Sequence, residues 1–266
     1  MSEGLTRILL FVVLAGLCFA PLEHIFGHGR RSGSRRSRWV DLGFATVGEA
    51  LVLLGMAAVV GVLLAGLDEV APDTLMFERV QSRALRAALE IGGGLLVFEL
   101  VGYAYHRAAH RVPALWRLHA VHHSAERMDW LASFRQHPLE ILAVTLAQNA
   151  PLVLLGLPLG SHALVLLLVR LNTVFVHADL RIPRGWWSAL VATPRFHHRH
   201  HARDEAPANF AAMFPWIDRV FGTHHEGRAE HFGLPTPAPR SFVGLLLMPL
   251  GRAWFERRGD PLVRER

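Results

Sequence analysis

The chain has 266 residues, of which 52% are hydrophobic and 19% are charged, with a formal net charge of +6. A soluble domain carries about 25% charged residues, so this composition argues against a soluble or disordered protein. The basic excess is typical of proteins that bind nucleic acid or a membrane surface. Apolar stretches near about 20 residues long favour the membrane, and no nucleic-acid partner is expected.

Apolar stretches predict an all-α polytopic membrane bundle of about four or five spans. The first stretch could instead be a signal peptide, but Pro21-Leu22-Glu23 is a poor cleavage site, which favours an uncleaved helix. The last two stretches form a hairpin, turned by Gly156-Leu157-Pro158 and Gly160. The predicted spans are residues 5–22, 42–67, 84–105, 139–157 and 160–178.

The positive-inside rule orients these spans. The Arg-rich segment 30–38 is expected in the cytoplasm and the acidic segment 68–79 outside. Residues 106–138 and the chain after 179 then lie in the cytoplasm, where we expect a histidine-rich helical cap. The location expected is a bacterial inner membrane. The chain divides into N-terminal spans and a basic loop, a histidine-rich domain and a C-terminal cytoplasmic tail, at residues 1–83, 84–225 and 226–266.

Histidine is the anomaly in the composition, with 17 residues, most of them between positions 106 and 231. Residues three or four apart project from one face of a helix, so clusters with this spacing predict stripes of imidazoles. Pro194 fits the first turn of the helix that carries the last cluster. The three clusters are His106 and His110; His119, His122 and His123; and His197, His200 and His201.

An imidazole-rich set without thiolate suits zinc, copper, iron or nickel. The lone Cys18 lies in an apolar stretch, which excludes a cysteine-based zinc site. Eight imidazoles exceed what one metal can use, so two metals are expected. Solvated loop histidines would account for one HxxxH cluster, but not for three clusters at the ends of membrane helices.

The order HxxxH, HxxHH, HxxHH resembles the fatty acid hydroxylase and sterol desaturase superfamily of integral-membrane di-iron enzymes. The resemblance covers roughly residues 90–225. Other stretches strengthen it, above all Ser133-Phe134-Arg135-Gln136-His137-Pro138-Leu139-Glu140, which is similar to the SFRxHPxE motif of the superfamily. The remaining similar stretches are Tyr105–Arg107, Leu115–His119, His122–Ser124, Val176–Leu180, Thr193-Pro194, Asn209-Phe210 and Asp218–Thr223.

The resemblance implies that the eight clustered histidines bind two irons and that His177 is a ninth ligand. The other interpretation of His177 is a histidine at a span end that reaches the membrane interface. Some relatives have a further histidine where this chain has Thr173.

A ligating imidazole usually donates its second N–H to a carboxylate or carbonyl. Glu99 lies on the same helical face as His106, and His137 is either a ligand or a donor held by Glu140. Asp218 is a further candidate, and His224-His225 has no assigned role. The residues predicted to support the ligands are Glu99, His137, Glu140 and Asp179.

By resemblance, the reaction is hydroxylation or desaturation of a lipid such as a sterol or fatty acyl chain. It uses O2 and two electrons from a separate reductase, cytochrome or ferredoxin. A zinc hydrolase would carry HExxH, which this chain lacks, and a metal transporter would place histidines within its spans. The alternative that stays open is a non-catalytic metal- or haem-binding membrane protein, although haem needs only one or two axial histidines.

Overall fold

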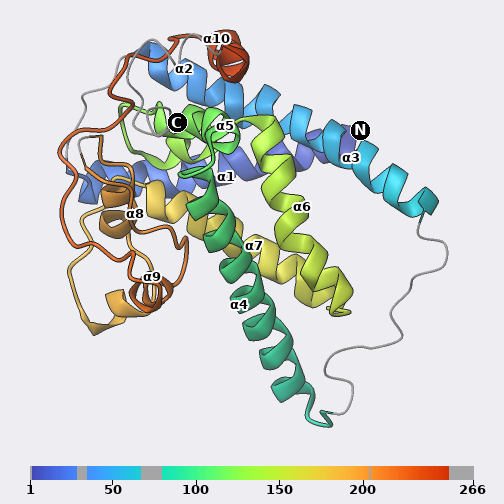
Figure 1. Cartoon of the computed structure of the whole chain (residues 1–266). Coiled ribbons are helices and arrows are strands. Elements are labelled where there is room, and N and C mark those ends of the chain that lie inside the picture. Colours follow the sequence, from blue (N-terminus) through green and yellow to red (C-terminus); the bar gives the residue numbers. More distant parts are fainter. Residues whose placement is uncertain (1, 29–34, 67–79, 204, 252–266) are drawn as a thin grey trace.

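The computed structural model describes residues 2–28, 35–66, 80–203 and 205–251, and this part of the chain is helical, as predicted. The long helices are α1 (Ser2–Phe26), α3 (Glu49–Gly66), α4 (Arg83–Ala109), α6 (Pro138–Leu154) and α7 (Leu159–His177) (Figure 1). Helix α2 (Arg35–Gly43) continues through a π-helical turn, η1 (Phe44–Gly48), into α3.

Short helices gather at one end of the long ones. They are α5 (Pro113–His123), α8 (Pro194–His200), α9 (Pro215–Val220) and α10 (Phe242–Leu247). Three 3-10 turns join them, η2 (Trp130–Phe134), η3 (Trp186–Ala189) and η4 (Met248–Leu250).

Three of the predicted membrane spans, 5–22, 42–67 and 160–178, overlap helices that are candidate spans by length and composition, the second over only part of its predicted range. The helical stretches Glu3–Phe26, Ser37–Ala58 and Gly160–His177 are long and apolar enough to cross a membrane. The predicted span 84–105 forms within α4 and the predicted span 139–157 forms as α6, an apolar helix of 17 residues. Neither of these two helices meets the same criterion, so the count of four or five spans stays a prediction.

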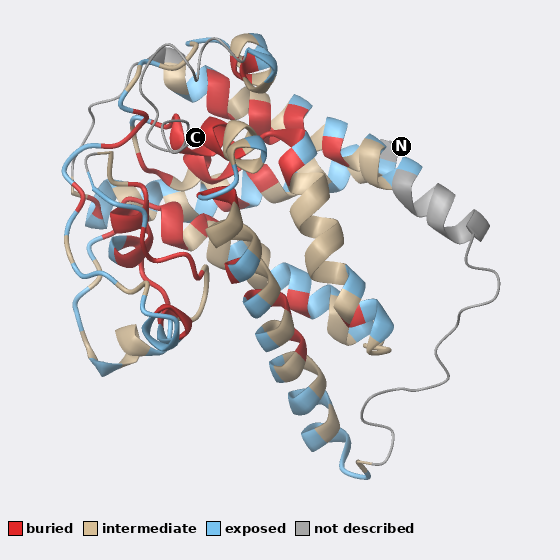
Figure 2. Cartoon of the chain, in the orientation of Figure 1, coloured by how far each residue is buried: buried red, intermediate tan, exposed pale blue. Residues whose placement is uncertain are grey.

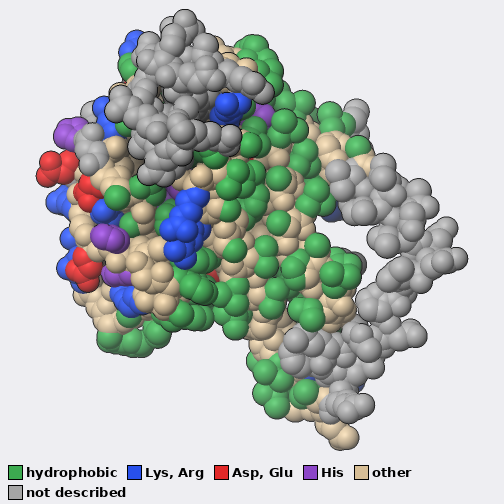
Figure 3. All heavy atoms as spheres, in the orientation of Figure 1, with side chains coloured by type: hydrophobic (Ala, Val, Ile, Leu, Met, Phe, Trp, Pro, Cys, Tyr) green, Lys and Arg blue, Asp and Glu red, His purple; other side chains and the backbone are tan. Residues whose placement is uncertain are grey.

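The buried core lies at the histidine-rich end. In Figure 2, buried residues concentrate where the end of α4 meets α5, α8 and the loops. By contrast, only 17% of the apolar stretch of α1 is buried, and Leu17 on that helix is 69% exposed. Charged and histidine side chains gather over the loops, whereas hydrophobic side chains cover the long helices (Figure 3). Such a large apolar surface is typical of a helix that faces lipid.

Proline sets the start of the short helices around the core. Pro113, Pro138, Pro194 and Pro215 each occupy the first turn of a helix. In the first turn of a helix, a backbone N–H has no acceptor within the helix, so proline loses no hydrogen bond there. The fixed φ of proline also suits a helix. The prediction for Pro194 is therefore confirmed, and Thr193 caps the same helix by accepting a hydrogen bond from the Phe196 amide at 3.3 Å.

All three predicted segments of the chain contribute to one apolar cluster. The cluster packs α2 and η1 from the N-terminal segment against α5 and the C-terminal residues. The tail therefore covers the outer side of α5, the helix that carries the second histidine cluster. The buried members are Val40, Phe44, Ala120, Val121, Leu234, Leu245 and Met248.

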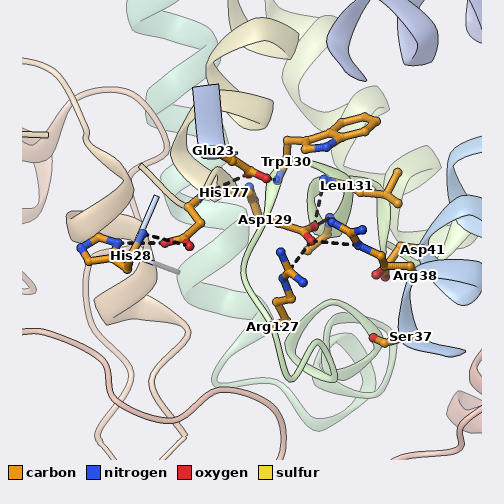
Figure 4. Close-up of polar contacts among 12 residues, drawn as sticks. Glu23, His28, Ser37, Arg38, Asp41, Arg127, Asp129, Trp130, Leu131 and His177 are labelled. Carbon is orange, nitrogen blue, oxygen red and sulfur yellow. Dashed lines mark hydrogen bonds and ion pairs between the residues drawn. The ribbon is translucent and has the colours of Figure 1, made fainter. Parts of the chain in front are cut away.

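A buried ion pair joins α2 to the segment before α6. Arg135 Nε donates to Asp41 Oδ1 at 2.6 Å, and both side chains are 6% exposed. The same guanidinium donates to Ser37 Oγ at 2.7 Å and to the Ser124 carbonyl at 3.2 Å. Figure 4 shows Asp41 and Ser37 on this side of the network. Arg135 thereby fixes its own backbone against two neighbouring elements.

Replacing Asp41 by alanine should destabilise the protein by about 3–5 kcal/mol, because it leaves the Arg135 guanidinium buried without a counter-charge. Thermal unfolding in detergent measures the loss. The control is Glu3→Ala, whose partner Arg7 is 82% exposed, and this variant should unfold like the parent. Equal unfolding temperatures for both variants would contradict the burial of the Asp41–Arg135 pair.

Candidate metal centre

The nine histidines predicted as ligands come together in two groups. Within each group, one ligand nitrogen from every residue lies within 4.8 Å of all the others. All members except His106 are buried. The five-histidine group is His106, His110, His119, His123 and His200; the four-histidine group is His122, His177, His197 and His201.

Helices α5 and α8 each contribute to both groups. His122 and His123 are adjacent in the chain but belong to different groups, and the same holds for His200 and His201. Neighbouring residues of a helix point in different directions, so one short helix can serve two sites. The rings of His123 and His201 stack with their centroids 4.3 Å apart, so the two groups lie face to face.

Backbone carbonyls fix the tautomer of several imidazoles. The Nδ1 atoms of His106, His122, His177 and His200 lie 2.7–3.0 Å from the carbonyl oxygens of Phe210, Arg135, Thr173 and Ala208, in that order. A carbonyl only accepts, so Nδ1 carries the proton in each of these rings. A neutral imidazole has one N–H, which leaves Nε2 with a lone pair.

These lone pairs point at one another. The Nε2 atoms of His122 and His177 are 3.2 Å apart, and neither carries a proton to share. In the five-histidine group, the Nε2 atom of His106 lies 3.1 Å from that of His119, whose Nδ1 lies 2.6 Å from Glu140 Oε1. Facing lone pairs repel unless a cation lies between them. The donor set therefore fits a divalent transition metal in each group.

Burial keeps the imidazoles in the form that binds metal. Removal from water lowers the pKa of His119 to about 3, and it lowers the pKa of His200 well below the ordinary value. Metal binding requires neutral imidazole. Protons therefore do not compete for these nitrogens near neutral pH.

Glu140 is the predicted supporting residue that contacts a ligand imidazole. Its Oε1 accepts a hydrogen bond from His119 Nδ1 at 2.6 Å, and both side chains are buried. The carboxylate fixes the tautomer of His119 with Nε2 facing the group. A carboxylate acceptor also makes the imidazole a stronger donor to a metal.

Among the described residues, the other three predicted supporting residues make no hydrogen bond to a ligand imidazole. Glu99 accepts hydrogen bonds from the amides of Met213 and Phe214, at 2.6 and 3.2 Å. His137 belongs to neither group: its Nδ1 caps α6 by accepting from the Leu139 amide, and its Nε2 donates to the Leu246 carbonyl.

Asp179 joins α1 to the segment after α7. Its carboxylate accepts from the backbone N and Nδ1 of His28, at 3.2 and 2.8 Å. Its own amide donates to Glu23 Oε1 at 3.0 Å, and Glu23 also accepts from the Trp130 amide at 2.7 Å. Figure 4 labels Glu23, His28 and Trp130 of this network, together with His177. Asp179 therefore anchors the chain directly after a ligand rather than the ligand ring.

Asn209 and Asp218 position two of the carbonyls that face the histidines. Asn209 has a positive φ of 58°, and its Nδ2 donates to the carbonyls of Phe196 and His225. Asp218 accepts from the amides of Phe210 and Ala211, both at 2.8 Å. The sequence marked these residues as motifs, but their role through the backbone was missed. The backbone carbonyl and amide of His225 bond to the side chain of Asn209.

The fold and the site define a helical histidine-cluster protein with candidate membrane spans. The chain belongs to the fatty acid hydroxylase family, whose model matches residues 91–223, half of the chain. Both histidine groups lie within the matched range. The family resemblance expected from the histidine clusters is thereby confirmed.

Among curated proteins, the chain is 28% identical over 170 residues to ornithine lipid hydroxylase OlsE of Rhizobium tropici, covering 62% of this chain and 51% of that protein. It is 30% identical over 138 residues to human alkylglycerol monooxygenase, covering 51% and 31%. It is 27% identical to fatty acid hydroxylase vlmA of Lecanicillium sp, covering 48% and 40%. The chain thus spans about half the length of the first relative and less of the others. No solved structure matches the chain.

Replacing Glu140 by glutamine should weaken metal retention by about tenfold or more, because it removes the carboxylate that holds His119. Dialysis of the purified protein against a graded chelator series, followed by metal analysis, measures the effect. The control is Glu226→Gln, an exposed acid paired with Arg184, which should retain metal like the parent. Identical chelator curves for the two variants would contradict the assigned role of Glu140.

Proposed function

We propose that this protein is a membrane-bound di-iron oxygenase that hydroxylates a lipid. The observation that carries the proposal is the pair of facing histidine groups whose Nε2 lone pairs converge. Relatives named as ornithine lipid hydroxylase, alkylglycerol monooxygenase and fatty acid hydroxylase support a lipid substrate. Their names favour hydroxylation over desaturation.

The chain's own residues would prepare the site. The five-histidine group would hold one iron and the four-histidine group the other. Two irons held in this way would pass electrons to O2 and so activate it toward an unreactive C–H bond. Carbonyls such as that of Phe210, and the carboxylate of Glu140, keep the imidazoles oriented. Burial excludes bulk water, which protects a strong oxidant from side reactions.

The reaction also requires components that lie outside this chain. Hydroxylation reduces O2 with two electrons and two protons, leaving one oxygen atom in the product and one in water. We propose a separate electron donor, a reductase, cytochrome or ferredoxin. We further propose that the histidine groups face the cytoplasm, because the Arg-rich segment 30–38 marks that side under the positive-inside rule. A bacterial inner membrane is the proposed location.

A non-catalytic haem protein accounts less well for the same geometry. Haem takes one or two axial imidazoles. The five-histidine group instead brings five ligand nitrogens within 4.8 Å of one another. Such a set would leave most of its imidazoles without a role in haem binding.

Lipid profiling of cells that express the protein tests the proposal. The intact protein should produce a new oxygenated lipid, and His200→Ala should abolish it because this change removes a ligand from the five-histidine group. The control is His224→Ala, a histidine outside both groups, which should retain the product at equal expression. A new double bond without added oxygen would indicate a desaturase. No change in any lipid class would favour the non-catalytic alternative.

A further inference from the structure

A cavity of about 390 Å³ lies beside the histidine groups, and none of its lining residues belongs to either group. Four parts of the chain form its walls: His28, Glu126–Met128, Asp179–Pro183 and Arg228–Phe232. Side chains from α8 and the residues after it complete the wall. The volume falls within the usual range of small-molecule sites, about 300–1,000 Å³.

Arginine dominates the charge of this cavity. The lining arginines are Arg127, Arg181, Arg195, Arg203 and Arg228, against the acids Glu126, Asp179 and Glu230. Two of these charges are already compensated, since Arg127 pairs with Asp129 at 3.1 Å and Asp179 accepts two hydrogen bonds from His28. In the part of the chain that the structure describes, no ion pair joins the other four arginines to a carboxylate.

Two of the arginines have charge or hydrogen-bonding capacity that the described residues do not satisfy. Partial burial, and then the neighbouring guanidinium groups of Arg184 and Arg228, lower the pKa of Arg195. Arg203 donates through one terminal nitrogen to the Phe232 carbonyl at 2.6 Å, while its buried Nε has no hydrogen-bond partner among the described residues. Guanidinium groups bind carboxylate and phosphate through paired hydrogen bonds.

The cavity lies where two candidate membrane spans end. His28 follows the span Glu3–Phe26 by two residues, and Asp179 follows the span Gly160–His177 by two residues. Span ends mark the level of lipid headgroups. The wall residue His198 donates Nε2 to the His177 carbonyl at 3.0 Å, so the cavity is adjacent to the four-histidine group.

We propose that this basic cavity binds a phosphate or carboxylate group, supplied in the membrane by the headgroup of an acidic lipid. The four arginines without a carboxylate partner would hold the anion through N–H groups that do not already donate to the carbonyls of Gly27, Gly227 and Phe232. The apolar side chains of Leu180, Ile182 and Phe232, which also line the cavity, would contact the carbon chain next to it. Anion binding needs no turnover, so this part of the inference is independent of the proposed function. Only the assignment of the bound lipid as the substrate rests on that function.

Calorimetric titration of the purified full-length protein in neutral detergent tests this site. The probes are inorganic phosphate, a short-chain phosphatidic acid and the uncharged diacylglycerol with the same chains. The protein should bind phosphatidic acid at least about tenfold more tightly than diacylglycerol, since each charged hydrogen bond contributes substantially to affinity. Phosphate that binds as tightly as phosphatidic acid would assign the site to a free anion, and weaker phosphate binding would assign it to a lipid headgroup.

Variants test whether the preference for phosphatidic acid over diacylglycerol arises in this cavity. Arg195→Gln with Arg203→Gln should abolish the preference for the anion, and so should Arg195→Gln with Arg228→Gln, which changes only exposed side chains. The control is Arg240→Gln, an exposed arginine outside the cavity, which should keep the preference. An anion preference that survives both double variants, or no preference in the parent, would overturn the inference. Iron content measured on the same samples tests the proposed function separately.

Discussion

The central constraint on this structure is the convergence of nine imidazoles. Without a cation between them, their facing lone pairs would repel one another. Their Nε2 atoms approach to 3.1–3.3 Å, and several of these rings carry their single proton on the far nitrogen. A metal ion between the facing lone pairs would remove this repulsion, and other groups hold the rings in place. Helix ends, backbone carbonyls and one carboxylate keep the imidazole rings in place. These contacts explain why the buried core lies at the histidine-rich end.

The supporting contacts extend outward in a connected network. The backbone carbonyl of Arg135 accepts a hydrogen bond from His122 Nδ1, while the guanidinium of Arg135 pairs with Asp41 of α2. Asp179 directly follows the segment that carries His177, and it is held by His28 and Glu23 at the end of α1. The first two candidate spans are thereby tied to the four-histidine group, which contains both His122 and His177, through polar contacts. The long helices carry most of the exposed apolar surface, and the short helices α5 and α8 carry most of the grouped histidines.

Much of this centre could be predicted from spacing, because residues three or four apart share a helix face. The division into two groups could not, since it depends on how α5 and α8 are rotated against α4 and α7. His122 and His123 look alike in the sequence but serve different groups. The sequence also could not predict which carbonyls accept hydrogen bonds from the histidines. Every residue has a carbonyl, and only the fold brings those of Ala208 and Phe210 to the imidazoles. His137 looked like a donor to a ligand, but its position at the start of α6 makes it a cap.

The central claim is that two adjacent metal ions occupy the two histidine groups. The most direct test is metal analysis of the purified full-length protein combined with Mössbauer spectroscopy after growth on ⁵⁷Fe. The account predicts about two irons per chain, each in a site of imidazole ligands rather than in haem. Stoichiometric haem, or a single zinc ion with no iron, would contradict it.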